Sequence, residues 1–141
     1  MKKYDWHLII PLSLPGPIMG LLTLYGIISF GIDRWFWLAI SVVAAVTIAR
    51  RVESNAFGHG ALVGLLLGAT SKLIQALWAD VYVAHNPELL DKLTGTTSGS
   101  AFQYRMLMLV PFVGLVNALL VGLMSYFAHK AMPHPRREEE G

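Results

Sequence analysis

Lys72 is the one basic side chain that stands well inside a long apolar run, and it is where chemistry would first be sought. A lysine at the centre of a bilayer costs about 2.5–3.5 kcal/mol on insertion scales, so such a residue usually faces other helices and has polar partners. Gln75 and Asn117 also stand in apolar runs and are suited to bond with it, and Asp80 is the nearest acidic residue along the chain. These four residues form a candidate polar site.

Two interpretations of Lys72 stay open. A direct ion pair with Asp80 is not expected, because eight residues of helix rise about 12 Å and helical side chains lean toward the N-terminus. Lys72 then either extends toward an interface or makes structural hydrogen bonds, or it binds a ligand, an anion or a proton.

Other kinds of site find no support in the residue types. The chain has no cysteine, and no two of its five histidines lie three or four residues apart on one helix, so no metal site is predicted. The histidines stand near segment ends and are interpreted as interfacial. No base is arranged to activate a serine or threonine. We predict no catalytic residue, no cofactor and no enzymatic activity, and the scattered basic residues predict no nucleic-acid binding.

The elements that carry these residues are predicted from the distribution of charge. Of 141 residues, 55% are hydrophobic and 14% charged, against about 45–50% and about 25% in soluble domains. The charges cluster between runs long enough to cross a membrane, which takes about 20 residues. We therefore predict an all-α membrane protein, with one domain over 1–132 and a charged cytoplasmic tail over 133–141. Its bundle of four transmembrane helices covers about 8–32, 34–50, 57–84 and 105–129.

Local signals refine this prediction. Pro11, Pro15 and Pro17 predict a kinked first helix, either sheltered by the bundle or broken to line a cavity. Asp33 is a suitable N-cap for the second helix. Asn86-Pro87 opens a short interfacial helix between helices 3 and 4, with Leu89, Leu90 and Leu93 toward the membrane, and 94–100 follows as a flexible linker.

Small residues recur at intervals of four in the third helix. Gly60, Gly64 and Gly68 form one row, which continues through Lys72, Ala76, Asp80 and Ala84 if the helix is unbroken. Such rows let two membrane helices approach closely. The partner is either the fourth helix, where Gly114, Ala118 and Gly122 repeat the spacing, or another copy of the chain.

Basic residues predict the orientation. With four spans, one side of the membrane carries seven of them and the other three, Lys72 being set aside. The positive-inside bias places the richer side, with both termini, in the cytoplasm.

The stretch FGHGALVGL at Phe57–Leu65, the glycine-spaced helix and the segment 86–90 (NPELL) resemble a family of small bacterial four-helix membrane proteins of unknown function, frequent in Bacteroidota-like bacteria. The resemblance extends over all four helices. It implies a membrane fold and no known activity or catalytic residue.

We therefore expect a non-enzymatic multi-pass protein of the bacterial inner membrane. Its partners are the lipid bilayer and either other membrane subunits or copies of itself. It is an accessory or structural subunit of a larger complex or a homo-oligomer; the alternative is a small transporter or channel with a polar site around Lys72.

Overall fold

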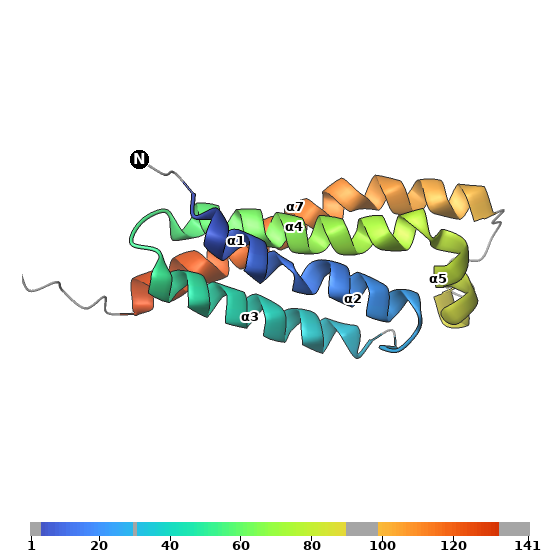
Figure 1. Cartoon of the computed structure of the whole chain (residues 1–141), viewed down its shortest axis with the longest axis horizontal. Coiled ribbons are helices and arrows are strands. Elements are labelled where there is room, and N and C mark those ends of the chain that lie inside the picture. Colours follow the sequence, from blue (N-terminus) through green and yellow to red (C-terminus); the bar gives the residue numbers. More distant parts are fainter. Residues whose placement is uncertain (1–3, 30, 90–98, 133–141) are drawn as a thin grey trace, which may run out of the picture.

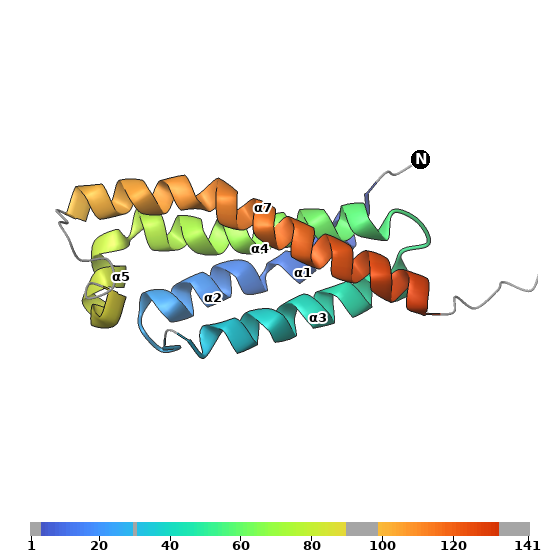
Figure 2. The ribbon, with the colours of Figure 1, turned by 180° about the vertical axis from the view of Figure 1, so that it is seen from behind.

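The computed structural model describes residues 4–29, 31–89 and 99–132, and within these ranges the chain is helical and has no strand. The helices α1 and α2 lie almost in line, and α3, α4 and α7 run alongside them (Figures 1 and 2). The short helix α5 lies across one end. The bounds are α1 Trp6–Ser13, α2 Pro15–Leu24, α3 Asp33–Arg51, α4 Ala56–Leu77, α5 Ala79–His85 and α7 Gly99–Ala131.

Three helical stretches in the described ranges are long and apolar enough to cross a membrane, namely Trp6–Leu24, Ala56–Leu77 and Ser100–Ala131. The helix α3 is 19 residues long but has charged residues at both ends, Asp33 and Arg34 at one and Arg50 and Arg51 at the other. The beginning of α1, the α3–α4 connection and the end of α7 lie at the same end of the molecule (Figure 1). We call it the terminal end.

The prolines interrupt the first helix at one residue, Leu14. Because Pro15 has no N–H, the carbonyl of Pro11 loses the donor that would normally come four residues later. The backbone N–H of Leu14 takes its place and donates to Pro11 O at 3.3 Å. The helix then restarts with Pro15 in its first turn, where a missing N–H costs little.

The first apolar run ends its helix earlier than predicted. We expected helix to about residue 32, but α2 stops at Leu24 and Gly26 adopts φ +66°. A Cβ at Gly26 would lie 2.6 Å from the carbonyl oxygen of His85 at the end of α5. This turn therefore requires glycine both for its backbone conformation and for its contact with α5.

The predicted helix over 57–84 is two helices, because the chain turns at Trp78 (φ −113°, ψ 45°). The row through Gly60 and Lys72 therefore does not continue to Asp80 and Ala84, which lie on α5. The Asn86 side chain holds α5 in place by donating to Thr23 O of α2 at 3.0 Å and to Tyr82 O at 2.9 Å. The tertiary hydrogen bond to Thr23 fixes the direction of α5 after a bend that no glycine or proline marks in the sequence.

The connection before α7 is described only in part. Leu89, which we expected to face the membrane, is buried with Tyr82, Phe102 and Met106 in a second core cluster. Leu90 and Leu93 lie outside the described residues, as does the tail 133–141. The helix α7 begins at Gly99 instead of about 105, because Phe102 and Met106 pack against α5 and the end of α4.

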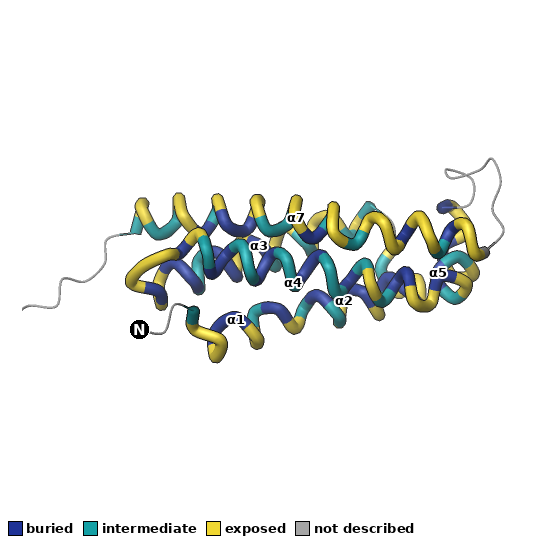
Figure 3. Tube along the Cα trace, turned by 90° about the horizontal axis from the view of Figure 1, so that it is seen from above, coloured by how far each residue is buried: buried dark blue, intermediate teal, exposed yellow. Residues whose placement is uncertain are grey.

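The main core lies between α1, α3, α4 and α7 toward the terminal end. Its centre is formed by fully buried Ile9, Ile48, Val63, Leu67 and Val121. The helix α4 carries ten buried residues, whereas the outward side of α7 is exposed along its length (Figure 3). The helix α4 is therefore the central element.

Glycines bring α4 close to its neighbours on two sides. A Cβ at Gly60 would meet the Ser125 hydroxyl and the Val121 carbonyl, one at Gly64 would meet the backbone of Asn117, and one at Gly68 would lie 2.9 Å from Val113 O. On the other side, Cβ atoms at Gly16 and Gly20 of α2 would lie 2.8 Å from Leu67 and 3.1 Å from Ser71 of α4, respectively. The row of α4 therefore faces α7 of the same chain.

The close contact between Gly64 and the Asn117 backbone can be tested by adding one methyl group. Gly64→Ala places a methyl group against the Asn117 backbone, so the helices must separate, and we expect a loss of about 1–3 kcal/mol of unfolding free energy. The matched control is Gly114→Ala, whose new Cβ meets the movable Leu65 side chain at 3.1 Å. Thermal unfolding in mild detergent measures both variants. Equal melting temperatures for Gly64→Ala and the unchanged chain would contradict the close approach at Gly64.

Candidate functional site

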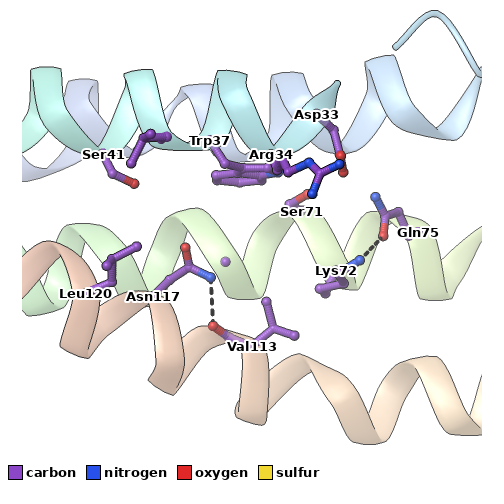
Figure 4. A pocket seen from close by; sticks show the side chains of 12 residues that line it. Asp33, Arg34, Trp37, Ser41, Ser71, Lys72, Gln75, Val113, Asn117 and Leu120 are labelled. Carbon is purple, nitrogen blue, oxygen red and sulfur yellow. Dashed lines mark hydrogen bonds between the residues drawn. The ribbon is translucent and has the colours of Figure 1, made fainter. Parts of the chain in front are cut away.

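A cleft of about 370 Å³ lies between α3, α4 and α7, and it contains Lys72. It is partly open, and Figure 4 shows side chains of all three helices turned into it. Most of its polar groups come from α3 and α4, whereas α7 adds one amide and apolar surface. Its lining residues are Asp33, Arg34, Trp37, Leu38, Ser41, Gly68, Ser71, Lys72, Gln75, Val113, Asn117 and Leu120.

Lys72 is held by a chain of hydrogen bonds that crosses to α2. Its Nζ donates to Gln75 Oε1 at 2.7 Å, and Gln75 Nε2 donates to Thr23 Oγ1 at 2.7 Å. The Thr23 hydroxyl in turn donates to the carbonyl of Met19 at 2.8 Å. Gln75 is therefore fixed at both ends of its amide, and it presents its oxygen to the ammonium group.

Asn117 lies in the same cleft but does not bond to Lys72. Its Nδ2 donates to Val113 O, one turn earlier in α7, at 2.9 Å. The backbone of Asn117 is the surface on which Gly64 packs, and its side chain lies beside Gly68. Asn117 therefore joins the glycine contact to the wall of the cleft.

The start of α3 supplies two charged residues to the cleft, Asp33 and Arg34. Gly31, with φ +111°, accepts from Arg34 Nε at 2.8 Å through its carbonyl and donates to Asp33 Oδ1 at 3.1 Å through its N–H. The Asp33 carboxylate therefore accepts a hydrogen bond from the turn before α3. We expected Asp33 to be the N-cap of this helix, but the N-cap is Ile32, whose side chain makes no hydrogen bond. The turn leaves the terminal nitrogens of Arg34 without a partner in the described part of the chain.

Two buried serines face the cleft with unpaired hydroxyls. Ser41 of α3 is 1% exposed and Ser71 of α4 is 2% exposed. Their oxygens point toward the opposite helix in Figure 4, and neither has a hydrogen-bond partner among the described residues. Most other helical hydroxyls of this chain do bond to a carbonyl four residues earlier: those of Ser13, Thr23, Thr47 and Thr70.

The structure unites some residues of the predicted polar site and separates one. Lys72 and Gln75 are bonded, Asn117 lies across the cleft from them, and Asp80 is exposed on α5 and does not line the cleft. The packing residues Gly114, Ala118 and Gly122 lie on the side of α7 that meets α4, next to Leu65, Gly64 and Phe57, respectively.

Sequence reasoning did not predict the residues that α3 contributes to the cleft, nor Ser71 of α4. It used Asp33 and Arg34 only to bound a helix, and it gave Ser41 and Ser71 no role. One signal was present, since Ser71 precedes Lys72 directly and is buried by the same turn of α4. The contribution of α3 had no local signal, because it depends on the tertiary packing of that helix.

His59, predicted to be interfacial, lies in the first turn of α4. It is buried, its Nε2 accepts from the backbone N–H of Asp5 at 3.0 Å, and its Nδ1 pairs with Asn55 O at 2.9 Å. This geometry fits a neutral ring with the proton on Nδ1. His59 therefore ties the start of α1 to the start of α4, and the described residues contain no group of His, Asp or Glu that would hold a metal ion.

The cleft is suited to binding. Donors from Lys72, Arg34, Ser41 and Ser71 converge on one volume, and formal charges of +1, +1 and −1 from Lys72, Arg34 and Asp33 leave it with +1. No protein-family model, no curated protein and no solved structure matches the chain. The chemistry of this cleft is therefore argued from its own residues.

The bond between Lys72 and Gln75 is tested by a double-mutant cycle. Gln75→Leu leaves the ammonium without its acceptor, and we expect unfolding free energy to fall by about 1–3 kcal/mol. Adding Lys72→Met should recover most of this loss, because no charge then needs a partner. Gln103→Leu on α7 is the control, since Gln103 makes no hydrogen bond in the described part of the chain. Strictly additive losses in chemical denaturation would show that the two side chains are not coupled.

Proposed function

We propose that this chain is a non-enzymatic integral membrane protein of the bacterial inner membrane and an accessory or structural subunit of a larger membrane complex or of a homo-oligomer. In this proposal α1–α2, α3, α4 and α7 form a four-helix transmembrane bundle with both termini in the cytoplasm. The observation that carries it is the outward face of α7.

That face is apolar over most of the helix length. Met108 and Phe112 are 69% and 63% exposed, and the same side continues through Leu115, Leu119, Leu123 and Phe127. Soluble monomers rarely expose apolar patches of more than a few hundred Å². Lipid or partner helices would cover this face, while the hydrogen-bonded polar groups stay inside.

The fourth span in this proposal is α3. Its uncharged part, from Trp35 to Ala49, rises about 22 Å, which is short for a hydrocarbon core of about 30 Å. Arg34, Arg50 and Arg51 are exposed, so their stems can extend toward the headgroups at both ends. Four spans also agree with the terminal end, because an even number of crossings brings both chain ends to one side.

An apolar groove supports the role as a subunit. It lies between α3 and α7, has a volume of about 360 Å³ and is lined only by apolar residues, among them Ala45, Leu123 and Phe127. Helix partners in membranes associate by close packing of this kind. The groove therefore suits the side chains of another transmembrane helix.

The second candidate is a small transporter or channel with its polar site around Lys72. The cleft favours it, because an ionisable residue such as Lys72 inside an apolar helix marks many substrate paths. Copurification in mild detergent separates the candidates. A reproducible heterologous partner supports the subunit of a larger complex. A clean homo-oligomer agrees with a structural homo-oligomer and with a transporter, and ligand binding by the cleft then separates these two.

Reporter fusions test the membrane topology. With four spans and seven of ten loop and tail basic residues on the terminal end, a fluorescent protein fused after Gly141 should be bright, and alkaline phosphatase there inactive. The same phosphatase inserted at 96–97 should be active, because that loop would lie outside. Active phosphatase at the C-terminus would overturn the orientation, and equal activity at both positions would show that α7 does not cross the membrane.

A further inference from the structure

We propose that the cleft between α3, α4 and α7 binds the monoanionic group of an amphipathic ligand, a carboxylate or a phosphate, between Lys72 and Arg34. This inference rests on the second proposed function and names its ligand class. The shared chemistry is an oxyanion with apolar surface attached. An anionic lipid headgroup and a free organic acid both offer it.

The serine hydroxyls show that the cleft has polar groups to satisfy. Their oxygens are accessible from the cleft, because in the described residues the one fully buried hydroxyl without a hydrogen bond is that of Ser125. Ser41 and Ser71 come from different helices, yet both face the same volume and lack partners in the described ranges. Two unsatisfied donors on opposite walls fit a ligand with several acceptor oxygens.

The cations supply the charge that such oxygens need. Lys72 donates one of its three N–H groups to the neutral amide of Gln75. It makes no ion pair within the described part of the chain. Arg34 uses Nε for the Gly31 turn, and its terminal nitrogens have no hydrogen-bond partner in the described part of the chain. Hydrogen bonds from charged donors to oxyanions are about twice as strong as neutral ones.

Asp33 limits the charge of the ligand instead of preventing its binding. Its carboxylate accepts from the Gly31 N–H and stands beside Arg34, so the cleft keeps a formal charge of +1. A monoanion neutralises that charge, whereas a dianion would be repelled by Asp33. We therefore expect a preference for carboxylates and phosphodiesters over dianionic phosphomonoesters.

The remaining surface of the cleft suits the apolar part of the ligand. Trp37 and Leu38 of α3 face Val113 and Leu120 of α7 around the polar centre. A volume of about 370 Å³ is at the lower end of that of small-molecule sites. It accommodates an anionic headgroup with a few carbons, and its open side admits a longer chain.

The test measures ligand binding by the full chain in phosphatidylcholine nanodiscs, by calorimetry at constant ionic strength with chloride as reference. Phosphatidylglycerol in the nanodisc probes the lipid source, and sodium butyrate and inorganic phosphate probe the free source. We expect saturable binding of one source that Lys72→Met and Arg34→Gln each weaken about tenfold or more. Lys130→Met removes an exposed lysine outside the cleft and should have no effect.

Serine variants test the geometry without changing charge. Ser41→Ala and Ser71→Ala should weaken binding several-fold with no loss of melting temperature, whereas Ser13→Ala, whose hydroxyl bonds to Ile9 O, should leave binding unchanged. Lys72→Arg should retain binding, which separates lost charge from misfolding. No saturable binding of any probe, or binding unaffected by the cleft variants, would overturn the proposal. If the reporter fusions give the expected topology and no probe binds, only this inference is rejected, and the proposed membrane topology is kept.

Discussion

The close approach of α4 and α7 is the constraint on which the rest of the structure depends. Between Gly60 and Gly68 the two backbones are so close that no side chain fits, and four residues later the same row carries Lys72. The cleft includes Gly68 and Lys72, so it opens where the glycine contact ends. The glycines of this row hold α4 and α7 together. The lysine at the end of the row places an ammonium group beside the gap between the two helices.

The other side of α4 is fixed just as firmly, and this makes the cleft a defined site. Gly16 and Gly20 bring α2 against α4, and Gln75 reaches across that contact to Thr23. Asn86 then ties α5 to the same turn of α2 through Thr23 O. Lys72 is therefore oriented by Gln75 of its own helix, and a hydrogen bond to Thr23 of α2 holds Gln75 in place.

Local pattern predicted the helical class, the glycine row and the proximity of Lys72 to Gln75, because each depends on residues within one helix. It failed where tertiary contacts decide. The direction of α5 after the bend at Trp78 is fixed by Asn86 bonding to a helix 63 residues away, and the bend removed Asp80 from the site. Asp33, Arg34 and Ser41 could not be assigned to the cleft from sequence, since no local pattern records how α3 packs on α4 and α7. The early end of α2 at Leu24 is of the same kind, because Gly26 in the turn that follows is required by a contact with α5.

Cysteine cross-linking tests the central contact most directly, because the chain has no cysteine of its own. A Cβ at Gly114 would lie 3.3 Å from the Cβ of Ala69, close to the usual spacing of about 3.5–4.5 Å in disulfides. Ala69→Cys combined with Gly114→Cys, oxidised in native membranes, should lose its reactivity to maleimide while keeping the mass of a monomer, and each single variant should keep its free thiol. Disulfide-linked dimers, or two thiols that stay reactive, would show that α4 does not pack against α7 of its own chain.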